Sequence, residues 1–293
     1  MAEKSEISPK GAADLSAAPS IFAGIALADP VVMGILNTTP DSFSDGGDLR
    51  DVAGAIATGL AMREAGAAIL DIGGESTRPG SDPVPVEEEL RRTIPVVLGL
   101  AKAGAIVSID TRHAAVMRAG IDAGARIVND VTALAGDPDS IGVVAGSGVS
   151  VVLMHMQGEP KTMQQDPHYD DVVHEVCDYL AARIAACEAA GIVRDRIAID
   201  PGIGFGKTLD HNLRLLNGLG AFRSLGCPIL IGVSRKSFIG RVAGNAALKA
   251  RLGGSLAAAL AAVDRGARIV RAHDVPETVQ ALRIQAAIDC AGT

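Results

Sequence analysis

The chain has 293 residues, of which 48% are hydrophobic and only 2% aromatic, a length and composition that suit one large α/β domain or two small ones. Its formal net charge of −7 disfavours a duplex-binding protein, because such proteins carry a basic face that neutralises phosphates. We therefore expect no nucleic-acid partner, and any anionic ligand must meet locally clustered cations.

The sequence predicts a short tail followed by one domain. Residues 1–20 are polar and lack the apolar core of a signal peptide, so we predict a flexible tail over 1–20 and one domain over 21–293. No apolar run approaches the roughly 18 residues that a membrane span needs, so no membrane partner is expected. The four cysteines are widely spaced without a C-x-x-C pair, which favours a reducing, cytoplasmic location.

Short β-branched apolar runs alternate with helical patterns along the chain, which indicates repeated βα units and a parallel sheet covered on both faces. The predicted strands are 31–36, 68–72, 106–109, 126–128, 150–154, 197–199, 229–233 and 268–270. The clearest predicted helices are 52–65, 86–102, 170–190 and 275–288, and Gly66, Gly104 and Gly191 close three of them. Eight such units predict a closed (β/α)8 barrel, the TIM barrel, rather than an open doubly wound sheet.

Each predicted strand leads into a polar residue, and in barrels of this kind the C-terminal strand ends build the active site. These residues are Asn37, Asp71, Asp110, Asn129, His155, Asp200 and Ser234, and then Arg271 with His273. A single Asn, Asp or Ser at such a place is often only a helix cap or turn former. Polar residues at all eight strand ends together predict one functional rim.

Three loops after these strands have unusual composition. Residues 37–47 form a long polar loop that carries Phe43 and is predicted to fold over a substrate. Residues 71–80 place Arg78 beside flexible glycines, where its guanidinium could hold phosphate oxygens. Residues 200–208 resemble a nucleotide loop superficially, but Pro201 stands where a P-loop needs glycine, and the Rossmann spacing also breaks.

Cations and carboxylates are both predicted at the rim. Residues 234–237 and 271–274 bring cations to neighbouring units and predict an anion site, which a helix beginning near Ser237 would strengthen. Asp110, Asp200 and Asn129 could pair with a heterocycle that presents adjacent N–H donors and a carbonyl. Ion pairing with Lys236 or a nearby arginine remains an alternative role for the two carboxylates.

The histidines show no metal-binding spacing, so a permanent zinc site is not predicted. Mg²⁺ bound through one protein oxygen and substrate phosphates leaves almost no sequence signature, and Asn37 is a candidate ligand of that kind.

Residues 37–47, 71–80, 200–207 and 234–237 together resemble the dihydropteroate synthase family, and the resemblance spans residues 31–288. Shorter motifs at 108–111, 128–130, 154–158 and 271–275 occur in the family's order. The resemblance implies an enzyme that joins 6-hydroxymethyl-7,8-dihydropterin pyrophosphate to p-aminobenzoate, releases pyrophosphate, uses Mg²⁺ and forms a homodimer through barrel helices.

The resemblance also implies a role for each site residue. The pterin would bind Asp110, Asn129, Met154, Asp200 and Lys236, and the pyrophosphate would bind Asn37, Arg78, Arg271 and His273, with Mg²⁺ at Asn37. The p-aminobenzoate site would contain Thr77, Pro79, Phe205 and Ser237, with Asp41 and Phe43 arriving when the first loop closes. Asp110, Lys236, Arg271 and His273 would be the catalytic residues of a dissociative reaction.

A second hypothesis, of a different class, is a pterin-binding module that passes a folate methyl group to a corrinoid partner. We consider it because those modules resemble the barrel predicted for this chain. A methyl carrier has no pyrophosphate to hold, so the cations at 234–237, Arg271 and His273 favour the synthase.

Overall fold

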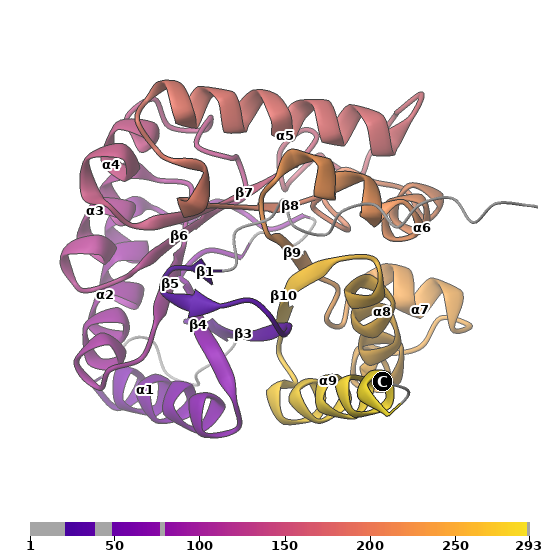
Figure 1. Ribbon diagram of the computed structural model, residues 1–293. Coiled ribbons are helices and arrows are strands. Elements are labelled where there is room, and N and C mark those ends of the chain that lie inside the picture. Colours follow the sequence, from indigo (N-terminus) through magenta and orange to yellow (C-terminus); the bar gives the residue numbers. More distant parts are fainter. Residues whose placement is uncertain (1–20, 39–48, 77–79, 292–293) are drawn as a thin grey trace, which may run out of the picture.

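The computed structural model describes residues 21–38, 49–76 and 80–291, in which eight parallel strands form a closed barrel (Figure 1). The strand order follows the sequence, and the last strand pairs with the first. The strands are β3 (Val31–Asn37), β4 (Ala67–Gly73), β5 (Val107–Asp110), β6 (Ile127–Asp130), β7 (Ser150–Met154), β8 (Ile197–Asp200), β9 (Ile229–Gly232) and β10 (Ala267–Ala272). The predicted (β/α)8 fold is confirmed.

Helices surround the barrel and connect its strands (Figure 1). They are α1 (Leu49–Glu64), α2 (Val86–Lys102), α3 (Ala114–Asp122), α4 (Ser140–Ser147), α5 (Val172–Ala189), α6 (Leu209–Asn217), α7 (Ser237–Val242), α8 (Leu252–Asp264) and α9 (Val275–Cys290). Three short 3-10 helices are η3 (Arg194–Arg196), η4 (Leu219–Leu225) and η5 (Leu248–Ala250). Among the described residues, none of these helices is long and apolar enough to cross a membrane.

The eight predicted strands overlap the observed ones and differ only at their ends. Asn37 and Asp200 were expected just after their strands, but each is the last residue of its strand. Asn37 pairs with Gly73 across the sheet, and Asp200 pairs with Met154. The hydrogen-bonded ladder therefore continues one residue beyond the apolar pattern, which alone defined the predicted ends.

The glycines predicted to end helices have the expected backbone. Gly66, Gly104 and Gly191 follow α1, α2 and α5 with φ values of 107°, 77° and 91°. Glycine adopts these angles without the steric cost that a Cβ imposes.

The barrel contains two separate apolar layers. The larger layer lies between the strands and the surrounding helices and includes Val97, Leu100, Leu180 and Phe222, all fully buried. The smaller layer fills the barrel interior; its buried strand residues are Met33, Ile69, Ile127, Val152, Ala198, Leu230 and Ile269. The described chain thus has the covered parallel sheet that its continuous apolar runs predict.

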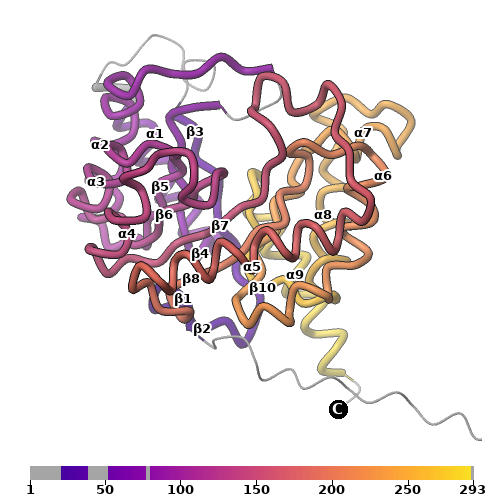
Figure 2. Tube along the Cα trace, turned by 90° about the horizontal axis from the view of Figure 1, so that it is seen from above, coloured from indigo at the N-terminus to yellow at the C-terminus, as the bar shows by residue number. Residues whose placement is uncertain are grey.

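A short antiparallel hairpin, which the sequence analysis did not predict, closes one end of the barrel. It consists of β1 (Ile21–Phe22) and β2 (Ile25–Ala26), which lie at the lower end of the barrel in Figure 2. Phe22 is 1% exposed and packs with the interior layer. The strand starts lie at this end, so the opposite end, where the strands finish, is left for ligands.

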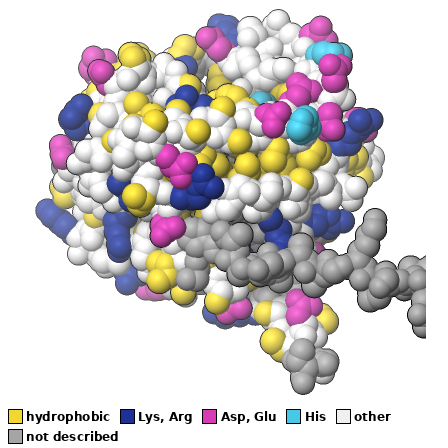
Figure 3. Space-filling model, turned by 45° about the horizontal axis from the view of Figure 1, so that its top comes forward, with side chains coloured by type: hydrophobic (Ala, Val, Ile, Leu, Met, Phe, Trp, Pro, Cys, Tyr) yellow, Lys and Arg dark blue, Asp and Glu magenta, His cyan; other side chains and the backbone are white. Residues whose placement is uncertain are grey.

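One face of the molecule shows how its charges are distributed (Figure 3). Lys and Arg side chains are interspersed with Asp and Glu there, and they form no continuous basic surface on that face. An anion that binds on this face would therefore meet individual cations rather than a basic surface.

Candidate active site at the C-terminal strand ends

The polar strand ends come together at one rim of the barrel. Asn37, Asp110 and Asp200 end β3, β5 and β8, and Asn129 and Arg271 are the penultimate residues of β6 and β10. Because the strands are parallel and close into a barrel, these ends share one rim, as the sequence predicted.

Arg271 is the centre of the polar network at this rim. Its Nε donates to Asp71 Oδ2 and its Nη2 donates to Asp110 Oδ2, each over 2.6 Å. Asn129 Nδ2 donates to the same Asp71 oxygen over 3.1 Å. The fully buried Asp71 therefore orients both a predicted pyrophosphate residue and a predicted pterin residue.

Burial and pairing determine the charges in this network. Burial raises the pKa of Asp110, and the paired Arg271 guanidinium acts to lower it. Burial also opposes the charge of Arg271, but the carboxylates of Asp71 and Asp110 outweigh it and raise the pKa of the guanidinium. Arg271 therefore remains positively charged in half-buried surroundings, where a cation attracts a phosphate more strongly than in open solvent.

The buried Asp200 and the half-buried Lys236 form a second charge group at the rim, beside Gly232. Lys236 Nζ donates to the carbonyl of Ile203, and Asp200 Oδ1 accepts the N–H of Gly202 over 2.7 Å. Burial raises the pKa of Asp200, whereas Lys236 acts to lower it. Burial lowers the pKa of Lys236 to about 8, and Asp200 acts in the opposite direction.

Two strand-end glycines leave space beside these charge groups. A Cβ at Gly73 would lie 3.6 Å from Asp110 Oδ2. A Cβ at Gly232 would lie 3.8 Å from Lys236 Nζ and 3.9 Å from Asp200 Oδ2. Side chains at these two positions would fill the space next to the carboxylates, so the glycines keep it open for a ligand.

Three further predicted residues lie around Asp200 and Lys236. The Phe205 ring lies against Lys236, whose Nζ is 4.8 Å from the ring centroid. Met154 ends β7 with 4% of its surface exposed, and Ser237 begins α7 as an exposed residue. The structure thus brings Met154 and Phe205 to the same part of the rim as the Asp200 group.

The cations of residues 234–237 differ in their availability. Arg235 Nε donates to Asp274 Oδ2 over 3.0 Å, so a carboxylate already balances this arginine. Ser234 Oγ lies 3.0 Å from His273 Nδ1 and accepts the backbone N–H of His273 over 3.2 Å. Of the two basic residues in this motif, Arg235 is thus paired with Asp274, Lys236 lies beside Gly232 together with Asp200, and Ser234 orients His273.

Several predicted residues cannot be placed. Asp41, Phe43, Thr77, Arg78 and Pro79 lie outside the described residues, and so does the predicted tail.

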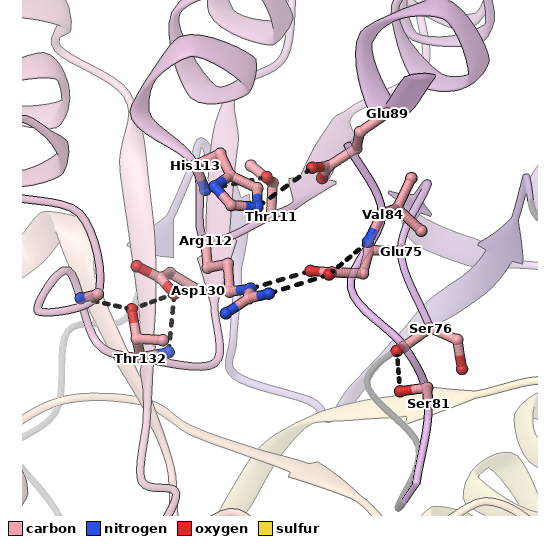
Figure 4. Close-up of polar contacts among 11 residues, drawn as sticks. Glu75, Ser76, Ser81, Val84, Glu89, Thr111, Arg112, His113, Asp130 and Thr132 are labelled. Carbon is pink, nitrogen blue, oxygen red and sulfur yellow. Dashed lines mark hydrogen bonds and ion pairs between the residues drawn. The ribbon is translucent and has the colours of Figure 1, made fainter. Parts of the chain in front are cut away.

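Next to these undescribed positions, a network that the sequence analysis missed holds the loop after β4 (Figure 4). Arg112 donates through Nε and Nη2 to the two carboxylate oxygens of Glu75 over 3.0 and 3.1 Å. Glu75 Oε1 also accepts the backbone N–H of Val84 over 3.1 Å. One carboxylate therefore joins both ends of the loop to the segment after β5.

Asp130, which follows Asn129, has a structural role. It accepts the N–H of Thr132 over 2.7 Å (Figure 4) and the N–H of Leu134 over 2.9 Å. It therefore stabilises the turn after β6 rather than facing a ligand.

Lys207 and His155 were also missed as a pair. Lys207 Nζ lies 2.9 Å from His155 Nδ1, and the two residues are 2% and 6% exposed. The sequence drew attention to Lys207 through the comparison of residues 200–208 with a P-loop. That comparison failed, so no function was predicted for this lysine.

The fold and rim define a class: a (β/α)8-barrel enzyme with buried carboxylates and cations gathered at the C-terminal ends of its strands. Residues 33–273 match the model of the pterin binding enzyme family. The chain is 50% identical over 259 residues to the dihydropteroate synthase of Escherichia coli strain K12, covering 88% of this chain and 91% of that protein.

Solved structures show the same relationship. The dihydropteroate synthase of Xanthomonas albilineans with 4-aminobenzoic acid is 50% identical, with a TM-score of 0.85, and the match covers 91% of this chain and 96% of that one. The same enzyme in complex with 7,8-dihydropteroate is 48% identical with a TM-score of 0.82, over 90% of this chain and 95% of that one. The chain belongs to the dihydropteroate synthase family.

Proposed function

We propose that the described rim residues carry out the dihydropteroate synthase reaction, in which p-aminobenzoate replaces pyrophosphate on the methylene carbon of a dihydropterin. The observation that supports this best is the ion pairing of Arg271 with Asp71 and Asp110 at the same rim as Asp200 and Lys236, which both lie beside Gly232. Both charge groups stand beside glycines that leave ligand space.

The pterin would lie between these groups. Asp200 offers a carboxylate for adjacent ring N–H donors, Lys236 offers donors for the ring carbonyl, and Asn129 offers one donor and one acceptor. Met154 would pack against the ring. Asp110 would face the developing positive charge of the pterin and stabilise it.

The pyrophosphate would lie towards Arg271 and His273. As the C–O bond of the methylene carbon breaks, negative charge grows on the leaving group, and Arg271 stabilises it where water is excluded. The aniline nitrogen then forms the C–N bond and loses a proton to water. Phe205 and Ser237 would border the p-aminobenzoate site.

Mg²⁺ is proposed as a cofactor held by Asn37 and the substrate phosphates. The described residues contain no group of three His, Cys, Asp or Glu side chains that could hold a metal without the substrate. A single amide oxygen at the end of β3 fits an ion that keeps most of its ligands as water and phosphate oxygens. When bound, the ion would supply additional positive charge to the leaving pyrophosphate.

The direct test mixes purified protein with the pterin pyrophosphate, p-aminobenzoate and Mg²⁺ and follows pyrophosphate release. We expect release that depends on p-aminobenzoate and dihydropteroate that forms in equal amount. A pterin-binding methyl-transfer module would bind the pterin and release no pyrophosphate, so that outcome would overturn the proposal.

We also propose a homodimer formed through the helices from α6 to α9. Among the described residues, exposed large apolar side chains gather on these neighbouring helices: Leu213, Val242, Leu248, Ile284 and Ile288, at 42% to 67% exposure. Light scattering should give twice the chain mass, and Ile284→Glu with Ile288→Glu should halve it. A cytoplasmic location is proposed as well, supported by the four free cysteines.

A further inference from the structure

Lys207 is a buried cation that the proposed reaction does not use. It follows Phe205 by two positions in the segment between β8 and α6, and only 2% of its surface is exposed. A buried lysine costs considerable desolvation energy unless its donors are satisfied. Its contacts should therefore show what it contributes.

Three acceptors converge on the Lys207 ammonium. Nζ donates to the carbonyl of Phe205 over 2.9 Å, lies 2.9 Å from His155 Nδ1, and reaches the carbonyl of His155 over 3.4 Å. Burial lowers the pKa of Lys207 to about 7, and in its charged form the ammonium has three N–H donors and no acceptor, so His155 Nδ1 then accepts. This requires a neutral imidazole, in agreement with burial, which lowers the pKa of His155 to about 3.

The two loops joined by these bonds are in direct backbone contact. A Cβ at Gly202 would lie 1.9 Å from the carbonyl oxygen of His155, and a Cβ at Gly206 would lie 2.3 Å from that of Gln157. Tyr169, which follows β7, donates its hydroxyl to the carbonyl of Gly206 over 2.9 Å. The segment that carries Phe205 is thus held against the segment after β7 on both sides of Lys207.

We propose that Lys207 is a positioning residue for the second substrate, fixing the Phe205 backbone against the loop after β7 so that the Phe205 ring stays beside Lys236. This rests on the proposed function, because it takes Phe205 to border the p-aminobenzoate site. Of the five pterin residues, Asp110, Asn129, Met154 and Asp200 lie on β5 to β8 and Lys236 precedes α7, and the bonds of the Lys207 ammonium go to His155 and Phe205 instead. Losing Lys207 should therefore affect p-aminobenzoate much more than the pterin.

The test is steady-state kinetics of the full-length Lys207→Met variant with each substrate varied in turn. Methionine keeps the length of the side chain and removes every donor. We expect the KM for p-aminobenzoate to rise at least about tenfold, because a hydrogen bond from a charged group is lost, while the KM for the pterin pyrophosphate changes less than about twofold. Lys102→Met, at the exposed end of α2, is the matched control and should resemble the wild type.

Equal rises in both KM values, or no rise for p-aminobenzoate, would overturn the positioning role. If Lys207→Met does not fold, Tyr169→Phe decides, because it removes a single neutral bond to the same segment. That variant should raise the KM for p-aminobenzoate by about two- to tenfold, with the pterin KM unchanged. An inactive wild-type protein would instead contradict the proposed function. Titration calorimetry with the pterin would then show whether the variants bind it as the wild type does.

Discussion

At the scale of single residues, Arg271 connects the proposed pterin and pyrophosphate sites. Its Nε and Nη2 donate to Asp71 and Asp110, which hold the two edges of the guanidinium. A pterin that binds Asp110 would compete with Arg271 Nη2 for this carboxylate. The freed N–H groups of the guanidinium could then donate to the pyrophosphate. Asp71 would keep the other edge fixed, which reduces the entropy that binding must overcome.

Replacing Arg271 with alanine should therefore greatly weaken the pyrophosphate substrate. The loss of a charge-assisted contact costs about 1.5–3 kcal/mol, and Asp71 and Asp110 would in addition remain buried without their cation. Kinetics with varied pterin pyrophosphate measure the effect, and circular dichroism checks the fold. Unchanged kcat and KM would remove Arg271 from the phosphate site.

Asp71→Asn tests the orienting role separately, because Asp71 is fully buried behind Arg271 and does not reach the ligand space. We expect kcat/KM for the pyrophosphate substrate to fall by about tenfold or more, since the amide loses the charged bond to Arg271 Nε. Asp82→Asn, at an exposed residue paired with Lys161, is the control and should behave as the wild type. A wild-type value for Asp71→Asn would show that Arg271 needs no orienting carboxylate.

Asp200→Asn tests pterin recognition. The amide presents a donor where the ring edge also donates, so the shape of the site survives while the pairing fails. Titration calorimetry with the pterin should show weaker binding than the wild type by at least about tenfold. Binding as tight as that of the wild type would assign Asp200 another role.

The sequence located these residues better than it described their contacts. Strand ends are readable because apolar runs stop there, so Asn37, Asp110, Asn129 and Asp200 were placed at one rim correctly. The partner of Arg271 was not found, because Asp71 lies 200 positions away in the chain and only barrel closure brings the two together. An ion pair with a nearby arginine, left open for Asp110, is what the structure shows.

At the scale of single elements, the first turn of α2 places two neighbouring glutamates in opposite surroundings. Glu89 is fully buried, and burial raises its pKa to about 7. Glu88 pairs with Arg91 and Arg92, and these bonds lower its pKa to about 2. The same residue type in the same helical turn should therefore respond to pH in opposite directions.

Glu89→Gln should stabilise the protein at high pH. The folded state holds the Glu89 proton up to about pH 7, whereas the unfolded chain releases it near the ordinary glutamate pKa of 4.5, so stability falls as pH rises between these values. Removing the carboxyl should raise the unfolding free energy at pH 8 by up to about 3 kcal/mol and have little effect at pH 4. Urea unfolding at both pH values measures this.

Glu88→Gln is the matched control for that experiment. Its lowered pKa contributes stability that is present above the unfolded value and lost as pH falls, so the variant should be less stable than the wild type at pH 8. If both variants change stability alike at pH 8, burial of Glu89 does not determine the pH response.

Helix and strand positions were predictable because their apolar periodicity is local, and α2 was predicted with both of its ends correct. The hairpin of β1 and β2 was not, because two-residue strands are too short to show any period. The clamp between Glu75 and Arg112 was missed for a related reason. It joins two loops, and loops carry no period that relates one to the other.

At the scale of the whole molecule, the barrel separates stability from chemistry by placing them at opposite ends. The hairpin at the strand starts contributes Phe22 to the interior layer, while the charged groups occupy the strand finishes. Between the two ends lie the interior residues Met33, Ile69 and Leu230, which are all fully buried. This interior layer is close-packed. A structural change at the hairpin end can reach the charged rim only if the side chains of this layer move.

Phe22→Ala should therefore destabilise the protein without changing its recognition of substrates. Removing a buried phenylalanine costs about 3–5 kcal/mol, because the chain loses apolar burial and keeps part of the cavity. Thermal unfolding should show a clear drop in Tm, while both KM values, measured well below the new Tm, should stay within about twofold of the wild type. Val193→Ala, at an exposed apolar residue on the outside of the barrel, should change neither quantity. A large change in either KM for Phe22→Ala would show that the interior layer transmits strain to the rim and that the two ends are not independent.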